Sequence, residues 1–236
     1  MGYGLIRLDE VDSTQDEARR MAGDLAAPTW IFARHQTAGR GRRGRAWLQP
    51  RGNFSASLLL PYPGAPDQAA LRSFVAALAL ADALEMLGVA SALKWPNDVL
   101  VEGGKLAGIL LEGLPGGALA IGIGVNLATA PAPERLETGA TAPVALAQHV
   151  PGIGAEDFLA LLASAYGARE ESFMTFGFAP IRAAWLARAA RLGEEITVRL
   201  PRETITGIFK DVDEDGQLVL STPGGTRRFA AGEVFF

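Results

Sequence analysis

Hydrophobic and polar positions alternate in several short runs before residue 61 and again after residue 91, and this pattern predicts a sheet of short strands. The runs with a period of two, or with only apolar residues, lie at 5–11, 30–34, 53–60, 92–95, 99–101, 106–112 and 119–126. Turn signals separate the later runs: Pro96-Asn97-Asp98, Gly103-Gly104 and Pro115-Gly116-Gly117. Such turns are typical of hairpins, so we expect an antiparallel or mixed sheet.

Apolar residues at helical spacing predict four helices around these strands. The predicted helices lie at about 15–22, 67–88, 155–173 and 178–190. Asp12-Ser13-Thr14 supplies candidates for the N-cap of the first helix, and Gly88 ends the second. We expect the last two helices to lie on one face of the sheet.

The pattern changes after Gly193, where five short apolar runs follow one another at close spacing. They lie at 195–200, 204–211, 217–220, 227–229 and 233–236, and tight turns such as Asp215-Gly216 separate them. This spacing is typical of a small β-barrel. The sequence therefore predicts an α+β domain over residues 1–191 and a small C-terminal β-barrel domain over residues 192–236.

Composition narrows the class of protein. Of the 236 residues, 49% are hydrophobic and 20% are charged, which is a globular balance. The chain has no cysteine, which excludes a disulfide scaffold, a thiolate metal site and a cysteine nucleophile, and agrees with a reducing compartment. The first residues do not form a signal peptide, and the apolar stretch 74–84 is short and interrupted by Asp82. We expect a cytoplasmic protein without a membrane partner.

Charge is unevenly distributed along the chain. The net charge is -4, which argues against bulk binding to nucleic acid. Between residues 33 and 52, however, there is no acidic residue, and this stretch contains Arg34, Arg40, Arg42, Arg43, Arg45 and Arg51. A local excess of arginine in an acidic chain indicates a site for an anionic ligand.

The segment 36–47 reads Gln-Thr-Ala-Gly-Arg-Gly-Arg-Arg-Gly-Arg-Ala-Trp. Its glycines allow the backbone to approach a ligand closely, and its guanidinium groups are bidentate donors for phosphate or carboxylate. The alternatives are a solvated basic loop or a nucleic-acid contact. Two features favour a ligand site: the segment joins two predicted core strands, and Trp47 at its end offers a surface on which a base can stack.

A second group is Lys94-Trp95-Pro96-Asn97-Asp98, followed by Lys105-Leu106-Ala107-Gly108-Ile109-Leu110. Two lysines and a carboxylate at neighbouring strand ends suit a metal-bound polyphosphate, with Asp98 as a ligand of Mg²⁺ and Lys105 on a phosphate. The alternative is a plain hairpin with surface lysines, and these residues alone do not separate the two.

A third group, Gly122-Ile123-Gly124-Val125-Asn126, ends an apolar strand. It lacks the third glycine of a dinucleotide-binding fingerprint, and the residues around Lys105 do not fit a P-loop. Asn126 is either a hydrogen-bonding partner of a base or ribose, or a turn cap.

Taken together and in this order, these segments resemble the biotin protein ligases. The resemblance rests on GRGRRG at 39–44, KWPND at 94–98, KLAGIL at 105–110 and the Gly-x-Gly-Val-Asn that ends at Asn126. It implies a class II synthetase-like catalytic domain with a mixed sheet, followed by an SH3-like barrel. The helix-turn-helix of the repressor-type members has no counterpart before the first strand, so the resemblance implies the monofunctional type and no DNA partner.

The resemblance also implies roles for individual residues. The biotin-binding residues would be Ser13, Thr14, Gln36, Gly39, Arg40, Gly108 and Leu110. The nucleotide-binding residues would be Arg42, Arg45, Trp47, Lys105 and Asn126. Lys105, Arg40 and Asp98 would be catalytic, with Asp98 either at the metal or oriented toward the incoming lysine. The family usually has Asn where this chain has Gln15.

The implied reaction is the ATP-dependent activation of biotin to biotinyl-5′-AMP and its transfer to a lysine of a biotin carboxyl carrier protein of an acyl-CoA carboxylase. Mg²⁺ would arrive with ATP. The family includes monomers and homodimers, so both states stay open. Three alternatives also remain: a lipoate-protein ligase of the same fold, a nucleic-acid-binding protein that uses the arginine segment, and a non-catalytic biotin-binding module.

Overall fold

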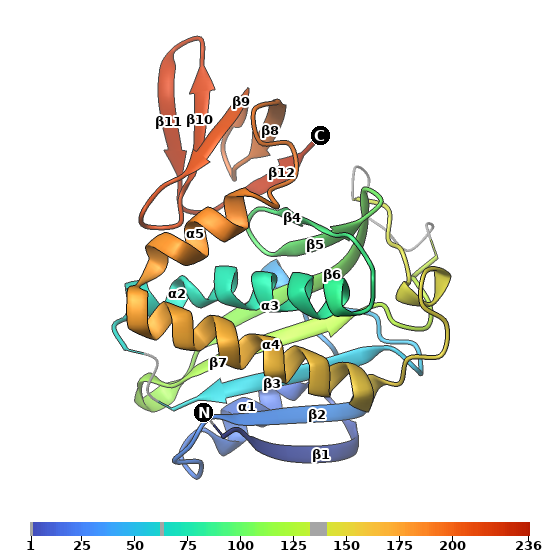
Figure 1. Cartoon of the computed structure of the whole chain (residues 1–236). Coiled ribbons are helices and arrows are strands. Elements are labelled where there is room, and N and C mark those ends of the chain that lie inside the picture. The colour runs from blue at the N-terminus through green and yellow to red at the C-terminus, as the bar shows by residue number, and fades with distance from the viewer. Residues whose placement is uncertain (1, 62–63, 133–140) are drawn as a thin grey trace.

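The computed structural model describes residues 2–61, 64–132 and 141–236. Its larger sheet has seven strands in the order β1-β2-β3-β7-β6-β5-β4 (Figure 1). The first pair, β1 with β2, is parallel, and the other pairs are antiparallel. The strands are β1 (Gly4–Val11), β2 (Thr29–Gln36), β3 (Phe54–Leu60), β4 (Ala92–Lys94), β5 (Asp98–Val101), β6 (Gly104–Gly113) and β7 (Leu119–Val125).

Five α-helices accompany the strands within the described residues: α1 (Thr14–Met21), α2 (Pro66–Ala70), α3 (Arg72–Met86), α4 (Ala155–Phe176) and α5 (Phe178–Leu186). Short 3-10 turns occur at Arg42–Gly44, Pro115–Gly117 and Leu146–Gln148. The single helix predicted over 67–88 is divided at Leu71 into α2 and α3. The helix predicted over 155–173 continues to Phe176 and ends at Gly177, whose φ of 72° favours glycine.

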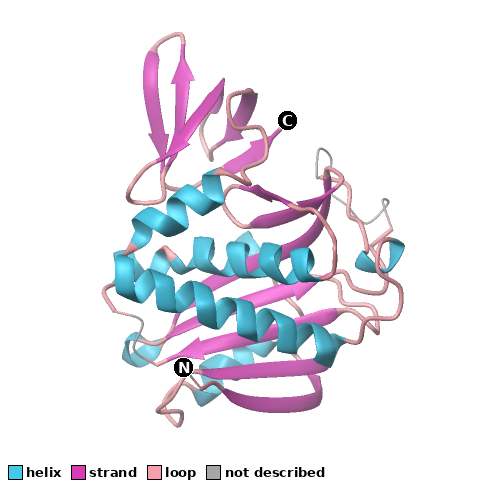
Figure 2. Ribbon diagram, in the orientation of Figure 1, coloured by secondary structure: helices cyan, strands magenta, loops and turns pink. Residues whose placement is uncertain are grey.

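The helices form layers on both faces of the sheet (Figure 2). Alternate strand residues such as Phe32, Phe54 and Ile121 are buried in the same apolar cluster as residues of α3 and α4. The intervening residues Ile31 and Leu59 pack instead with Ala18 of α1. The last two helices, α4 and α5, both contribute buried residues to the first cluster, as expected for helices on one face of the sheet. The helix α1 instead covers part of the opposite face.

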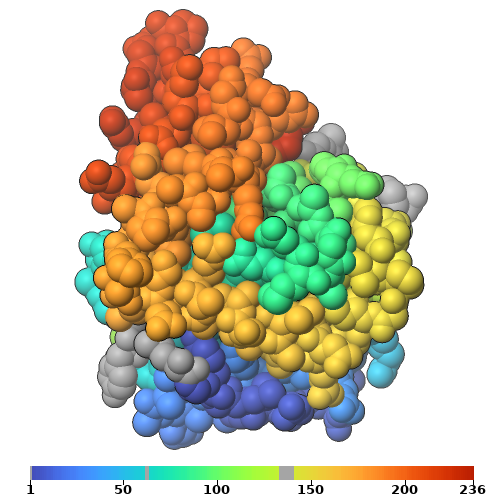
Figure 3. All heavy atoms as spheres, viewed as in Figure 1, coloured from blue at the N-terminus to red at the C-terminus, as the bar shows by residue number. Residues whose placement is uncertain are grey.

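The C-terminal residues form a separate antiparallel sheet of five strands in the order β11-β10-β9-β8-β12. The strands are β8 (Glu195–Arg199), β9 (Thr204–Val212), β10 (Leu218–Thr222), β11 (Gly225–Phe229) and β12 (Glu233–Phe235). In the space-filling view these residues form a protruding lobe at the top (Figure 3). The two sheets confirm the predicted fold class; the boundary at residue 191 stays a prediction.

Hydrogen bonds from Trp95 and Arg182 are among the contacts that fix the lobe to the rest of the chain. Trp95 Nε1 donates to Gly216 O at 3.1 Å, and Arg182 of α5 donates to Val212 O and pairs with Asp211.

In the described part of the chain, no helix is long and apolar enough to cross a membrane.

Candidate active site

A cavity of about 600 Å³ opens on the sheet face that α3 and α4 leave uncovered. Its floor is a row of residues that stand opposite one another on five neighbouring strands, from β3 to β4: Ser55, Gly124, Gly108, Asp98 and Lys94. Residues paired across antiparallel strands point to the same face. The strand register therefore brings the second and third sequence motifs to one surface.

One end of the cavity is lined mainly by uncharged polar side chains. Thr14 donates from both N and Oγ1 to Gln36 Oε1, at 2.8 and 3.1 Å. Ser57 Oγ donates to Thr14 Oγ1 at 2.9 Å, and Gln36 Nε2 donates to Ser55 Oγ at 3.4 Å. Ser13 is also buried here, at the start of α1. These hydroxyl and amide groups suit a small neutral polar ring that both donates and accepts hydrogen bonds.

Gln15 closes the same end of the cavity. Its Nε2 donates to Leu110 O and to Glu112 Oε2, both at 3.2 Å. Both partners are acceptors, which fixes the orientation of the amide. Gln15 Oε1 is buried and has no hydrogen-bond partner within the described ranges. An acceptor is therefore left for a donor on the ligand.

Glycines make room for two side chains along the floor. A Cβ on Gly122 would lie 2.8 Å from Gln15 Cδ, and a Cβ on Gly124 would lie 2.4 Å from Trp47 Cε2. A Cβ on Gly108 would lie 3.2 Å from Trp47 Cζ3. The indole of Trp47 therefore packs directly against the backbone of Gly108 and Gly124, where a larger residue would place its own side chain. The indole lies beside the charged half of the cavity.

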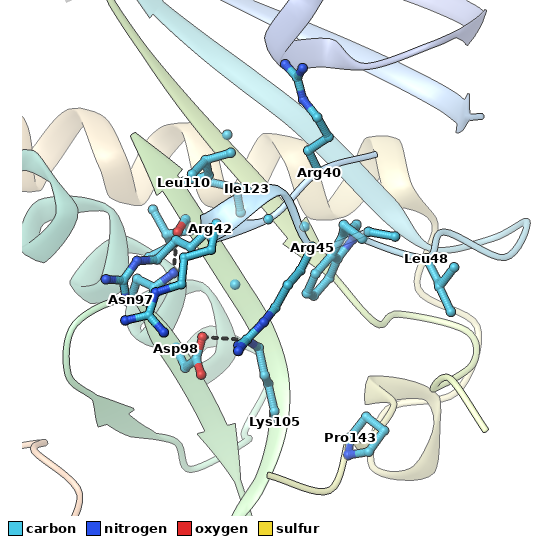
Figure 4. A pocket seen from close by; sticks show the side chains of 18 of the residues that line it. Arg40, Arg42, Arg45, Leu48, Asn97, Asp98, Lys105, Leu110, Ile123 and Pro143 are labelled. Atoms are coloured by element: carbon cyan, nitrogen blue, oxygen red, sulfur yellow. Dashed lines mark hydrogen bonds and ion pairs between the residues drawn. The ribbon is translucent and has the colours of Figure 1, made fainter. Parts of the chain in front are cut away.

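The arginine segment folds over this charged half. Arg42 donates to Asn97 Oδ1 at 3.3 Å (Figure 4). It also donates to Gly232 O of the C-terminal lobe at 3.4 Å. Arg43 pairs with Glu233 of the C-terminal lobe at 2.9 Å, and Arg45 pairs with the same carboxylate. Burial lowers the pKa of Arg42, and the charge of Arg43 acts in the same direction. Side-chain contacts with the lobe therefore add to the segment's own backbone hydrogen bonds, such as the one from Trp47 N to Gly39 O at 2.8 Å.

Arg40 lies apart from these arginines. Its side chain points away from Asp98 and Lys105 (Figure 4) and donates to Asp16 Oδ1 of α1 at 2.5 Å. Glu112 Oε2 lies 4.0 Å from the same guanidinium. Asp16 therefore holds Arg40 near the end of the cavity that contains Gln15, away from the other cations.

Lys105 and Asp98 form an ion pair at the centre of the cavity. Lys105 Nζ lies 2.6 Å from Asp98 Oδ1 and 5.8 Å from the centre of a Trp47 ring. Around this half of the cavity, five cationic side chains face two carboxylates, a net charge of +3; they are Arg42, Arg43, Arg45, Lys94 and Lys105 against Asp98 and Glu233. Such a surplus suits a polyphosphate.

Asn126 lies under Lys105, where β7 ends. It is 2% exposed, and its Nδ2 donates to Lys105 O at 3.4 Å. Its Oδ1 is buried without a hydrogen-bond partner among the residues that the structure describes. Asn126 is among the residues that line the cavity, and its unpaired acceptor suits an amino group of a ligand.

A resident metal ion does not fit the site. The described ranges contain no group of three histidine or acidic side chains that could hold one. Of the two carboxylates in the charged half, Glu233 is paired with Arg43 and Arg45. Asp98 suits Mg²⁺ that arrives on a polyphosphate, because this ion is commonly held by one or two carboxylates together with phosphate oxygens and water.

The structure brings every predicted site residue to this one cavity or its rim, although the side chain of Arg40 is turned toward α1. Ser55 and Ser57 were not predicted as site residues, although the alternation of polar and apolar residues within 53–60 was a signal for them. Glu233 was not predicted either. The local sequence offers no signal for it, since only the docking of the lobe brings it to Arg43 and Arg45.

Comparisons with known proteins identify the family. The model of the biotin/lipoate A/B protein ligase family matches residues 6–127, and that of the biotin protein ligase C-terminal domain matches residues 192–236. A biotin--[acetyl-CoA-carboxylase] ligase from Paracoccus denitrificans is 50% identical, over 97% of this chain and 99% of the relative. A bifunctional ligase/repressor from Bacillus subtilis is 32% identical, over 99% of this chain and 74% of the relative.

Solved structures agree with these relatives. Biotin protein ligase from Aquifex aeolicus in complex with biotin and ATP superposes with a TM-score of 0.85, at 29% sequence identity, over 98% of this chain and 97% of that one. The fold of both parts of the chain is thus shared with that ligase. The chain belongs to the biotin protein ligases of the biotin/lipoate A/B protein ligase family.

Proposed function

We propose that this chain activates biotin with ATP to biotinyl-5′-AMP and then transfers biotin to a lysine of a biotin carboxyl carrier protein of an acyl-CoA carboxylase. The observation that carries the proposal is the polarity of the cavity: one end is neutral and hydrogen-bonding, and the other has a net charge of +3. A ureido ring suits the first end, and a triphosphate suits the second.

In the first step a carboxylate oxygen of biotin attacks the α-phosphorus of ATP, and pyrophosphate leaves. Because two anions must meet, the step needs positive charge and positioning more than a strong base. We assign the ring end to Ser13, Thr14 and Gln36, with Gly39, Gly108 and Leu110 beside them. Lys105 would contact the carboxylate and the α-phosphate, since it lies between the two ends of the cavity.

Further assignments cover the nucleotide. Arg42 and Arg45 would bind its phosphates, Trp47 would stack near adenine, and the free acceptor of Asn126 would receive an adenine N–H. Arg40 would turn from Asp16 toward the biotin carboxylate. The arginine segment also covers the cavity, which would shield the reactive mixed anhydride from water.

In the second step the carrier lysine attacks the carbonyl carbon of the adenylate, and AMP leaves. Asp98 would hold Lys105 in place and would bind the Mg²⁺ that accompanies ATP, or orient the incoming lysine. The acyl group stays on AMP until transfer, so no nucleophile of the chain is required.

The proposal also covers partners and location. The net charge of -4 argues against DNA as a partner, and the absence of cysteine agrees with the cytoplasm. A homodimer and a monomer are both compatible with the family.

In the decisive experiment, the protein is incubated with ATP, Mg²⁺, labelled biotin and a carrier domain. The mass of the carrier domain is then measured by mass spectrometry. We expect a mass gain of one biotinyl group. Thermal stabilisation by biotin but not by lipoate would separate the biotin ligase from the lipoate ligase, because a ligand that binds only the folded state raises its stability. Stabilisation by lipoate alone, or no labelled carrier, would contradict the proposal.

A further inference from the structure

Lys94 is a buried cation that forms no ion pair with the described residues. It is 8% exposed, and its Nζ donates to Thr141 Oγ1 at 2.7 Å and lies 4.7 Å from the centre of the Phe236 ring. Both partners are uncharged. Burial lowers the pKa of Lys94, and the charge of Lys105 acts in the same direction, although the carboxylates of Asp98 and Glu233 partly oppose it. Because a buried charge is unfavourable unless an opposite charge reaches it, this position favours the approach of an anion.

Lys94 also has a defined place in the cavity. It ends β4 and stands opposite Asp98 on β5, and Asp98 stands opposite Gly108 on β6. Since opposite residues share a face of the sheet, Lys94 belongs to the cavity floor. It lines the cavity together with Lys105 and Arg42.

The order of the strands gives the direction in which a ligand must extend to reach Lys94. Gln36 and Ser55, at the neutral end, lie on β2 and β3, Lys105 lies on β6, and Lys94 lies on the outermost strand β4. Neighbouring strands are about 4.8 Å apart, so β4 lies roughly 10 Å beyond β6. A triphosphate whose α-phosphate is at Lys105 therefore extends toward Lys94 as it leaves the biotin end.

We propose that Lys94 binds the β- and γ-phosphates of ATP and stabilises them as they leave as pyrophosphate. The inference rests on the proposed function and adds a residue to its first step. In that step a bond forms between a carboxylate oxygen of biotin and the α-phosphorus. The bond from the α-phosphorus to the bridging oxygen breaks, and its electron pair goes to pyrophosphate. Lys94 has no part in the transfer to the carrier, which follows the departure of pyrophosphate.

The test compares Lys94→Met, which keeps the length of the side chain and removes its charge, with Lys210→Met. Lys210 is exposed on β9 and does not line the cavity, so it supplies the same chemical change at an unrelated place. Three quantities are measured: the affinity for inorganic pyrophosphate, kcat/KM for ATP in biotinyl-5′-AMP formation, and the rate of transfer from preformed biotinyl-5′-AMP to a carrier domain.

For Lys94→Met we expect the first two quantities to fall about tenfold to hundredfold, the range for one lost charged hydrogen bond. Transfer and biotin affinity stay at the level of the wild type, and Lys210→Met changes nothing. Lys94→Arg keeps the charge and should restore much of the pyrophosphate affinity.

Several outcomes would overturn the assignment. They are unchanged pyrophosphate affinity in Lys94→Met, equal slowing of transfer and adenylation, a parallel loss of biotin affinity, and equal pyrophosphate affinity in Lys94→Met and Lys94→Arg. A wild-type protein that forms no biotinyl-5′-AMP would instead contradict the proposed function. The two failures are therefore distinguishable.

Discussion

The ion pair between Lys105 and Asp98 places one ammonium group above Gly108, at the centre of the cavity. A Cβ on Gly108 would lie 3.6 Å from Lys105 Nζ, so the lysine folds back over the glycine toward Asp98. Charge that is fixed in place before the reaction stabilises a transition state without reorganisation. At the residue scale, the geometry therefore favours a direct role for Lys105 in adenylation.

We predict that Lys105→Ala raises the barrier to biotinyl-5′-AMP formation by roughly 3 kcal/mol, or about two orders of magnitude in rate, as expected for one preorganised electrostatic donor. Pyrophosphate release in the presence of biotin and ATP measures this step. Lys210→Ala is the control, since Lys210 is exposed in the C-terminal lobe. Release at a rate near that of the wild type would remove Lys105 from the step.

At the scale of elements, two glycines of β7 make room for side chains in two different parts of the cavity. Gly122 lies under Gln15, and Gly124 lies under Trp47. We predict that Gly122→Ala weakens the binding of biotin, whereas Gly124→Ala displaces the indole and weakens the binding of ATP. Each loss should be about fivefold to a hundredfold, because displacing a packed side chain by one methyl group costs about 1–3 kcal/mol.

Calorimetric titration of both variants with biotin and with ATP tests this separation. Gly113→Ala on β6 is the control, since a Cβ there meets nothing within 4 Å. Equal losses for both ligands in both variants would mean that the glycines only support the sheet.

The contact between the arginine segment and β12 depends on the ionisation of Glu233. Burial alone would raise its pKa, but the hydrogen bond from Arg45 and the charges of Arg45 and Arg43 lower it below the ordinary value of 4.5. A lowered carboxyl pKa stabilises the fold above 4.5 and ceases to do so as the pH falls through the folded-state pKa.

We predict that Glu233→Gln lowers the free energy of unfolding by roughly 1 kcal/mol at neutral pH, and that the difference from the wild type shrinks below about pH 4.5. Denaturant unfolding at several pH values measures this. Glu203→Gln, which breaks an exposed pair with Arg227, should have a smaller effect. A difference that does not change with pH would contradict the ionic origin of the contact.

Local signals predicted much of this arrangement, and contacts between distant elements account for the rest. The strands, and the positions of Trp47 and Asn126 in the cavity, could be predicted from short motifs. The reason is that strand alternation and turns are set by neighbouring residues. The break at Leu71 has no glycine or proline to mark it. The direction of Arg40 depends on Asp16, and the position of Glu233 depends on how the lobe packs, which no local pattern encodes.

At the scale of the whole molecule, one buried cluster joins both sheets. It contains Phe54 and Leu78 of the larger part and Val198, Phe209 and Leu220 of the C-terminal lobe. Burial shared in this way couples the unfolding of the two parts, because neither can open without exposing apolar surface of the other.

We predict a single thermal transition for the whole chain, with equal calorimetric and van't Hoff enthalpies. Trp95→Phe removes the indole donor to Gly216 O at 3.1 Å and should move the whole transition to lower temperature, by about 1 kcal/mol of stability, without dividing it. Scanning calorimetry measures both. Two separate transitions would show that residues 1–191 and 192–236 unfold independently. A single transition would mean that the lobe and the larger part unfold together. A loosened lobe would then also loosen the arginine segment, which Glu233 holds over the cavity.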